Sequence, residues 1–389
     1  MTVSPVVNTH VHFPPNFSAF TTVEDAIAVA TEQGVRAIGI SNFYDQQVYG
    51  SFAEQAAAAG ILALFGLEFI TLDPDLEAAG TLVNDPANPG RVYFCGKGIS
   101  PFREKSEAAA ATAAAMIAQL AAHFASVGLE TGLSAEVVAA DVAARTQVPV
   151  EYVSLQERHI ARAFQEALAA LPLAERAAVL EKAYGSPSGV DLDNAVALQG
   201  ELRSRLLKAG TPGFVPEVPL SFDAAYSYVL DMGGIPTFPI LADGAKALSP
   251  FEYPAESLAQ ELLRRKVYAA ELIPIRNKSA LVDEYVAALR GAGIIVMGGT
   301  EHNTADRIPY DPACVDGPLS DAARGAFWEA TCVVAAHQHL VARGEPGYVT
   351  ATGDLVGPDA AARRRSLADL GASLILDAHE AHDEQSEEA

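Results

Sequence analysis

Short apolar segments of strand length alternate with segments of helical pattern along much of this chain, and no other feature restricts its fold as strongly. The expected strands are 3–7, 35–41, 61–69, 91–95, 235–241, 268–274 and 294–299, and the expected helices include 22–33, 51–59, 221–231, 254–266, 279–291 and 319–343. Short strand–helix units that return to one core favour an α/β fold, a seven-stranded parallel (β/α) barrel, over an open doubly wound sheet. No Gly-X-Gly-X-X-Gly sequence follows the first strand, so a dinucleotide-binding domain is not indicated.

The middle of the chain departs from this alternation. Residues 104–210 are dominated by Ala, Leu, Glu, Arg and Gln at helical spacing, which predicts an inserted all-helical subdomain. The predicted division is a first part of the barrel at 1–103, the helical insertion at 104–210, a second part of the barrel at 211–345 and a C-terminal extension at 346–389. The acidic tail from residue 377 onward is expected to be mobile. Pro236 and Pro239 predict an irregular or edge position for the strand 235–241.

Composition limits the partners of the protein. The 389 residues carry 49 acidic and 26 basic side chains, and the net charge is −23. Such a field repels phosphate backbones and anionic lipid, so we expect neither nucleic acid nor a membrane surface as a partner. No apolar run reaches the roughly 20 residues of a membrane span. Three widely spaced cysteines and no recognisable leader predict a cytoplasmic protein, and the sequence leaves a homo-oligomer open.

The first expected strand leads into Asn8-Thr9-His10-Val11-His12. Residues two apart in a strand point to the same face, so His10 and His12 project side by side and could share one metal ion. The alternative is that the two histidines form a polar edge of the strand. The rest of the chain has to decide between these interpretations.

Polar side chains follow several other expected strands, where a parallel barrel collects its chemistry. Glu68 ends the third strand, Glu271 lies on the sixth, and Glu301 and His302 follow the seventh. His10, His12, Glu68 and His302 could converge on one divalent ion, while Glu271 or Glu301 could move protons. Histidine and carboxylate suit Zn²⁺, Mn²⁺ or Fe²⁺, and such an ion activates water near neutral pH. A single residue of this kind is more often structural than a ligand. Histidine or glutamate at the ends of three different strands favours a metal site.

Several basic residues near these strand ends could bind an anionic substrate. Arg91 and Lys97 flank the fourth strand, and Arg276 and Lys278 follow the sixth. Arg and Lys supply the charge-assisted hydrogen bonds that an anion requires in so acidic a protein. The alternative is that these side chains are solvated. Arg158, on an insertion helix, is interpreted as part of a solvated face, with a lid over the barrel mouth as the alternative.

Together these motifs resemble those of the PHP family, the polymerase and histidinol phosphatase domains. The resemblance rests on Asn8-Thr9-His10-Val11-His12, Gly39-Ile40-Ser41-Asn42, Gly66-Leu67-Glu68 and Gly299-Thr300-Glu301-His302, and it spans roughly residues 1–100 and 215–345. It implies the distorted seven-stranded barrel of that family, phosphoesterase activity, and metal ligation by His10, His12, Glu68 and His302.

The sequence differs from the family pattern at several ligand positions. Asn8 and Thr300 stand where the family has Asp, and Asn42-Phe43 stands where it has Asp-His. Phe238 lies near the position of another family histidine. The resemblance therefore implies a reduced site with one or two divalent ions per chain, Mn, Zn or Fe, in place of three.

Three hypotheses fit these residues. The first is a metal-dependent hydrolase, a phosphoesterase that acts on a small anionic substrate through a metal-activated water. The second uses the same ion in a lyase, isomerase or amide or lactone hydrolase that acts on a sugar acid or another carboxylate. The third is a non-catalytic barrel that binds a small anion, and the departures at Asn8, Asn42, Phe43 and Thr300 motivate it.

Overall fold

The computed structural model describes residues 5–99, 107–208, 210–215, 219–244 and 247–388. Within these residues, seven strands lie side by side in the order β1-β2-β3-β4-β6-β7-β8. Their bounds are β1 Val6–Val11, β2 Val35–Ile40, β3 Leu62–Leu72, β4 Arg91–Lys97, β6 Ile235–Ile240, β7 Ala269–Leu272 and β8 Ile295–Gly298, and the short β5 (Leu220–Ser221) pairs with the end of β3. A parallel bridge joins Val11 of β1 to Glu301, three residues after the end of β8, so the sheet nearly closes into a barrel.

The predicted α/β class and the distorted seven-stranded barrel with extra helices are confirmed, but one strand runs the other way. β4 pairs antiparallel with both β3 and β6, whereas the remaining neighbours pair parallel. The connection from β3 to β4 contains only the short helix α3 (Pro74–Ala78) and turns. Parallel strands need a crossover that returns the chain to its starting edge, and this connection instead folds the chain directly back.

β6 is an interior strand, so the edge position predicted from its prolines is wrong. It lies between β4 and β7, and every residue of the strand is buried. Pro236 pairs with Gly96 and Pro239 with Glu271, and the register continues across both prolines. Each proline removes one N–H from the ladder without ending it.

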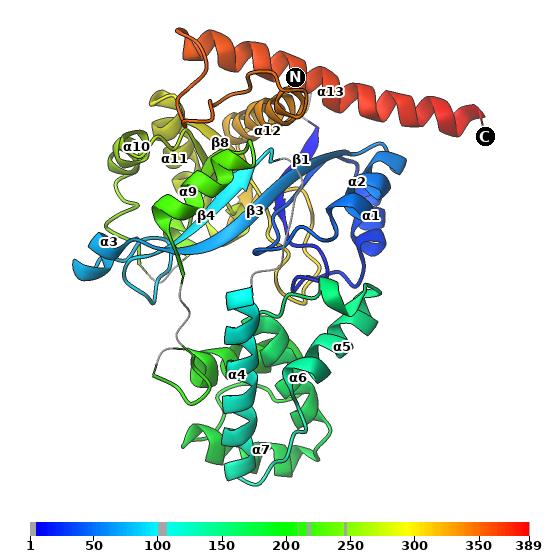
Figure 1. Cartoon of the computed structure of the whole chain (residues 1–389), viewed down its shortest axis with the longest axis vertical. Helices are drawn as coiled ribbons and strands as arrows, with labels where there is room; N and C mark the ends of the chain where they lie inside the picture. The colour runs from blue at the N-terminus through cyan, green and yellow to red at the C-terminus, as the bar shows by residue number, and fades with distance from the viewer. Residues whose placement is uncertain (1–4, 100–106, 209, 216–218, 245–246, 389) are drawn as a thin grey trace.

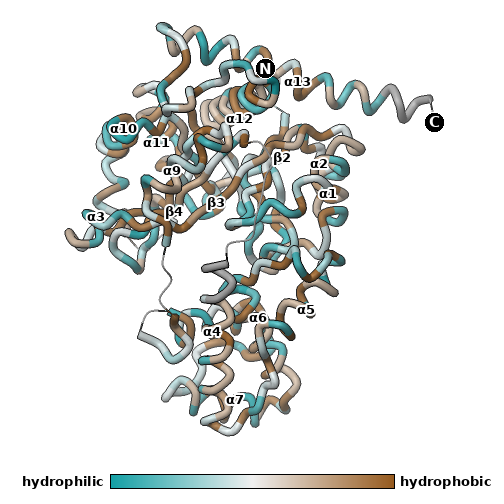
Figure 2. The backbone as a smooth tube through the Cα atoms, in the orientation of Figure 1, coloured by the Kyte–Doolittle hydropathy of each residue, from teal (hydrophilic) through white to brown (hydrophobic). Residues whose placement is uncertain are grey.

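Helices cover the outside of the barrel and bury an apolar stripe against it. They are α1 Val23–Glu32, α2 Tyr49–Ala58, α9 Phe222–Asp231, α10 Ala255–Arg264, α11 Ser279–Gly291 and α12 Asp321–Ala342. The hydroxyl of Thr22 accepts the Asp25 N–H at the start of α1, and that of Ser221 accepts the Ala224 N–H at the start of α9. Thr and Ser are typical N-cap residues. The strands they cover, β3 among them, are largely hydrophobic (Figure 2).

The helices between β4 and β5 form a second hydrophobic cluster of their own. They are α4 Glu107–Ser126, α5 Ala135–Thr146, α6 Glu157–Ala169, α7 Leu173–Tyr184 and α8 Ala195–Leu202, with the short turns η1 Val150–Tyr152 and η2 Arg203–Leu207. The described part of residues 107–208 holds no strand. In Figure 1 these helices lie below the sheet, on the side opposite α12 and α13.

The acidic tail continues a long helix, α13 (Ala360–Glu388), where a mobile segment was expected. α13 packs along α12, and Leu367 and Ile375 are buried there. Nearer the C-terminal end of α13, Nη1 of Arg36 on β2 lies 2.6 Å from Nδ1 of His379. This polar contact holds the helix on the barrel where the apolar contacts of Leu367 and Ile375 have ended. Among the described helices, including this one, none has the length and apolarity that crossing a bilayer would require.

Candidate metal centre

Two strands on either side of β2 bring the predicted ligands together. His10 and His12 lie at the end of β1, and Glu68 lies on β3, paired with Cys95 of β4. Glycines allow β1 to lie this close to its neighbours. A Cβ atom at Gly299 would meet the Cβ of His10, and one at Gly39 would meet the backbone of Thr9.

His10, His12 and Glu68 converge on one small volume. The Nε2 atoms of His10 and His12 lie 3.4 and 3.3 Å from the same atom, Oε2 of Glu68. All three side chains are buried, with exposed fractions of 1%, 1% and 4%. Neither Nε2 atom has a hydrogen-bond partner within the described residues. Because buried nitrogens without partners are costly, and because two imidazoles and a carboxylate form a common ligand set, these residues fit a divalent cation.

The charges of the cluster favour a cation at the same place. Burial and Lys97 lower the pKa of His10, but the Glu271 and Glu68 carboxylates outweigh them and raise that pKa well above its usual value. Burial lowers the pKa of His12. Burial raises the pKa of Glu68, yet His10 and His12 bring that pKa down to about 2. The Glu68 carboxylate, beside Nε2 of His10, therefore stabilises positive charge where a bound ion would lie.

Glu271 lies behind His10 and holds its ring, so the structure does not support its predicted role in moving protons. Its Oε2 atom lies 2.6 Å from Nδ1 of His10, and its Oε1 atom accepts the Thr9 hydroxyl at 2.6 Å. Glu271 is fully buried, and Lys97 and His10 bring its pKa to about 2 although burial raises it. A carboxylate on the far nitrogen of a histidine ligand fixes the tautomer and the ring orientation.

Lys97 is enclosed in the same network, which corrects its predicted role in binding substrate. Its Nζ atom lies 2.7 Å from the Thr9 carbonyl oxygen, 2.8 Å from Oγ of Ser41 and 2.8 Å from Oε2 of Glu271. An ammonium group has three protons, and these three partners engage all of them. The side chain is only 3% exposed, so no donor remains for a substrate.

His302 does not face the cluster as a ligand, although the sequence places it among the ligands. Its Nδ1 atom accepts the Thr300 hydroxyl at 2.7 Å, and its Nε2–H group donates to the Ile308 carbonyl at 2.9 Å. The Thr300 oxygen in turn accepts a hydrogen bond from Nδ2 of Asn8 at 2.7 Å. Burial lowers the pKa of His302 to about 4, so the ring is neutral. Both ring nitrogens are therefore occupied by a neutral hydrogen-bond chain.

Residues that depart from the family pattern pack and brace the strand ends. Asn42 accepts the Phe13 N–H at 2.8 Å and donates to the Phe13 carbonyl at 3.0 Å. Phe43 stacks on the ring of His12, with centroids 5.1 Å apart. Phe238 is buried in the hydrophobic core. None of these side chains offers a ligand atom to a further metal ion.

Glu301 and Arg276 form an ion pair at the mouth of the barrel. The Glu301 carboxylate also accepts a hydrogen bond from Nδ2 of Asn303. Its negative charge opposes the burial that lowers the pKa of His12. Glu301 and His302 have positive φ angles, 61° and 52°, which non-glycine residues adopt rarely. Such backbone strain is concentrated at functional sites.

The other predicted basic residues lie farther out. Arg91 begins β4, two and four positions from Tyr93 and Cys95, so all three share one face of the strand. Lys278 is exposed at the start of α11. Of the four predicted anion-binding residues, the structure thus places Arg276 at the mouth, Arg91 partly buried at the start of β4, Lys97 in the core and Lys278 in solvent.

Arg158 of α6 reaches the mouth from the insertion, a position that its helical pattern did not favour. Burial lowers its pKa to about 10, and the charges that act on it belong to Arg203, Glu301 and Arg276. The described part of the chain provides this guanidinium with no ion-pair partner. Gln156, next to α6, holds the insertion in place: its Oε1 accepts the Phe17 N–H at 2.8 Å and its Nε2 donates to Asn16 at 2.7 Å.

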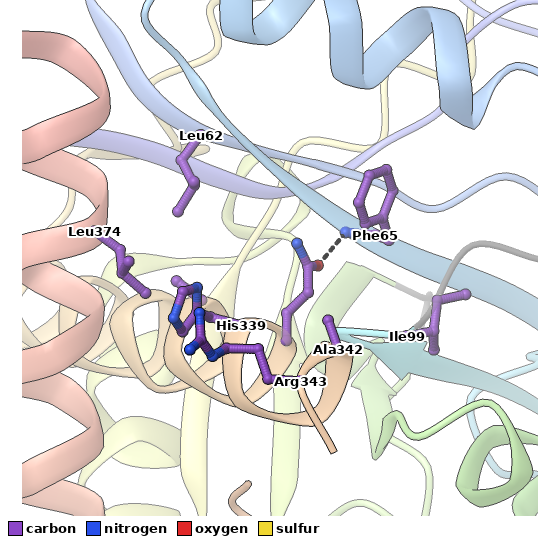
Figure 3. A pocket seen from close by; sticks show the side chains of 9 residues that line it. Leu62, Phe65, Ile99, His339, Ala342, Arg343 and Leu374 are labelled. Atoms are coloured by element: carbon purple, nitrogen blue, oxygen red, sulfur yellow. Dashed lines mark hydrogen bonds between the residues drawn. The ribbon is translucent and has the colours of Figure 1, made fainter. Parts of the chain in front are cut away.

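A separate apolar pocket of about 270 Å³ lies away from this centre. Figure 3 shows Leu62, Phe65, Ile99 and Leu374 around it, with the Gln338 side chain hydrogen-bonded to the Phe65 N–H. Leu62 begins β3 and Ile99 follows the end of β4, so the pocket lies at the opposite end of these strands from Glu68 and Arg91. It contains none of the predicted site residues.

Comparison with solved structures places this architecture among known folds. A proposed metal-dependent phosphoesterase from Bifidobacterium adolescentis aligns with 83% of this chain and 96% of its own, at 14% identity and a TM-score of 0.54. The chain shares the fold of that protein. An amidohydrolase from Chromobacterium violaceum, solved with bound sulfate and no metal, aligns with 82% of this chain and 93% of its own, at 14% identity and a TM-score of 0.48. No protein-family model and no curated protein matches the sequence.

Proposed function

We propose that this protein is a metal-dependent hydrolase of the PHP type, a phosphoesterase that acts on a small anionic substrate. One observation carries the proposal: two imidazole nitrogens without hydrogen-bond partners among the described residues and a carboxylate oxygen meet in a buried volume between the end of β1 and the middle of β3. His10, His12 and Glu68 would hold one divalent ion, Mn, Zn or Fe. When bound, such an ion supplies an activated water nucleophile and neutralises charge on the scissile group.

The surrounding residues prepare this site. Glu271 accepts a hydrogen bond from Nδ1–H of His10, which leaves Nε2 as the nitrogen that faces the site. Phe43 covers one face of His12 and keeps water from that side of the ring. Glu301 is the predicted proton-transfer residue that lies at the mouth, and the Arg276 guanidinium keeps its carboxylate in place. We assign proton transfer with the substrate to Glu301.

The arginines at the mouth support an anionic substrate. Arg158, Arg203 and Arg276 come from three different elements, and the charges of the last two act on the first. Arg203 is paired with Glu157 and Arg276 with Glu301. Arg158 remains protonated at neutral pH with its pKa near 10. A phosphate group would supply hydrogen-bond acceptors to this partly buried guanidinium, and the arginines would offset the repulsion that an acidic protein exerts on an anion.

Phosphate release tests the proposal. Protein loaded with Mn²⁺, Zn²⁺ or Fe²⁺ is assayed on a panel of small phosphate monoesters, with His12→Ala as the site variant and His339→Ala, an exposed histidine of α12, as the control. We expect metal-dependent turnover that falls roughly 100-fold or more in His12→Ala and is unchanged in the control.

Two outcomes contradict the proposal in different ways. Metal-loaded protein that leaves phosphate esters intact but cleaves lactones or amides, or converts a sugar acid, contradicts the phosphoesterase assignment. Protein that takes up no ion but gains thermal stability from a small anion contradicts the hydrolase assignment.

A further inference from the structure

Two sets of potential ligand atoms share His10. The first consists of His10, His12 and Glu68, and the second of His10, Cys95 and Glu271. All five side chains are buried. If both sets could hold a cation, the centre would be dinuclear.

The second set is already engaged by the protein itself. Oε2 of Glu271 lies 2.6 Å from Nδ1 of His10 and 2.8 Å from Nζ of Lys97. The other oxygen, Oε1, accepts the Thr9 hydroxyl. A cation here would have to displace these donors and take a proton from the Cys95 thiol.

The Lys97 ammonium cannot easily move away from this position. Its three protons are satisfied by Thr9, Ser41 and Glu271, and its side chain is 3% exposed. Its stem lies on β4 between two barrel strands, in register with Gly66 of β3 and Ile235 of β6. A buried positive charge a few ångströms from a second divalent ion would repel it strongly in this low-dielectric interior.

The other route to a further ion is closed by neutral groups. Asn8, Thr300 and His302 form a hydrogen-bond chain in which no carboxylate takes part. Phe43 stacks on His12 at the adjoining strand end. Glu68 is therefore the one carboxylate of the two sets that has no ammonium partner among the described residues.

We propose that the ammonium group of Lys97 takes the place of a second cation and fixes this centre at one divalent ion per chain. The proposal rests on the proposed function, because it assumes that His10, His12 and Glu68 bind the first ion. Lys97 and Glu271 then form an internal neutral pair that positions His10, and only Glu68 contributes net negative charge to the ion.

The number of bound Mn²⁺ ions tests this proposal. Wild-type protein, Lys97→Met and the control Lys278→Met, which changes an exposed lysine, are brought to equilibrium with increasing Mn²⁺. Bound manganese is counted by elemental mass spectrometry, and electron paramagnetic resonance distinguishes isolated from spin-coupled ions. We expect one isolated ion in the wild type and the control, and uptake approaching two coupled ions in Lys97→Met, because Glu271 is freed and the repelling charge is lost.

The double variant Lys97→Met/Glu271→Gln keeps the test decisive if the single variant does not fold. It removes both members of the buried pair, a milder change than leaving one charge unpaired, and at saturating Mn²⁺ it should bind one ion. Two ions in the wild type or the double variant, or one ion in folded Lys97→Met, would overturn the proposal. A wild-type chain that binds no Mn²⁺, Zn²⁺ or Fe²⁺ would instead contradict the proposed function.

Discussion

Nδ1 of His10 lies 2.6 Å from Oε2 of Glu271, and this contact determines which nitrogen of His10 faces the metal centre. The Nδ1–H group donates to the carboxylate, so Nε2 is the nitrogen that faces Glu68 and that would bind an ion once its proton is displaced. β1 carries the histidine and β7 carries the carboxylate, and these strands are not neighbours in the sheet. The near closure of the barrel therefore sets the orientation of a candidate ligand.

Glu271→Gln should weaken metal binding without removing a ligand. Glutamine cannot neutralise Lys97 and holds the His10 ring less firmly, so we expect the affinity for Mn²⁺ or Zn²⁺ to fall by roughly 10- to 100-fold. Competition with a chromophoric chelator measures this affinity. Glu256→Gln, an exposed substitution on α10, is the control. Equal affinities in Glu271→Gln and wild type would show that Glu271 does not orient His10.

His302→Ala should destabilise the fold and leave the metal content intact. The substitution leaves the Thr300 hydroxyl and the Ile308 carbonyl without their partner, and we expect a loss of about 1–3 kcal/mol in the free energy of unfolding. Urea unfolding gives the stability, and elemental analysis of the folded variant gives the metal content. Loss of the ion from folded His302→Ala would restore this histidine to the ligand set.

Arg158→Gln should weaken substrate binding more than turnover. Removing this partly buried guanidinium from the mouth should raise KM for an anionic ester by roughly 10-fold or more, with kcat and metal content little changed. Steady-state kinetics of metal-loaded protein measures the two constants separately. Arg162→Gln, on the same helix but paired with Glu166, is the matched control and should behave as wild type. An unchanged KM in Arg158→Gln would place the anion elsewhere.

Glu252 should make stability decline as the pH rises toward neutrality. Burial raises its pKa to about 7 from a usual 4.5, although the N–H groups of Leu241 and Ala242 oppose this. Because the folded state holds the proton more tightly, the stabilisation is complete below pH 4.5 and is lost as the pH rises through about 7. The loss amounts to at most about 3 kcal/mol.

Urea unfolding between pH 5 and 8 measures this slope in wild-type protein, Glu252→Gln and the exposed control Glu256→Gln. Glutamine cannot titrate, so Glu252→Gln should lose this part of the pH dependence while the control keeps it. The same slope in all three proteins would mean that Glu252 is ionised throughout the range.

Local pattern was sufficient to predict most of the barrel and the residues of the candidate metal centre on β1 and β3. Alternating strand and helix segments predicted its elements, and the two-residue period of a strand placed His10 beside His12. Glu68 follows from the rule that parallel barrels collect polar groups at strand ends. The direction of β4 could not be predicted in this way. It depends on whether the connection between β3 and β4 crosses back to the starting edge of the sheet or turns directly back, and strand periodicity does not report this.

The roles of the other polar residues depend on partners far away in the sequence. Asn8 and Thr300 are 292 positions apart, and their hydrogen bond is what removes His302 from the ligand set. Lys97 resembles a solvated lysine until Glu271 of β7 is placed beside it. Arg158 reaches the mouth only because Gln156 contacts Asn16 on the barrel. Local periodicity carries no information about such contacts.

The metal content of the protein tests the central claim most directly. Wild-type protein and His10→Ala/His12→Ala are purified without chelator or metal-affinity resin, incubated with Mn²⁺, Zn²⁺ or Fe²⁺, and analysed by elemental mass spectrometry, with circular dichroism to confirm folding. The account predicts about one ion per wild-type chain and none in the folded double variant. A double variant that keeps the full metal content, or a wild type that takes up no ion, would contradict it.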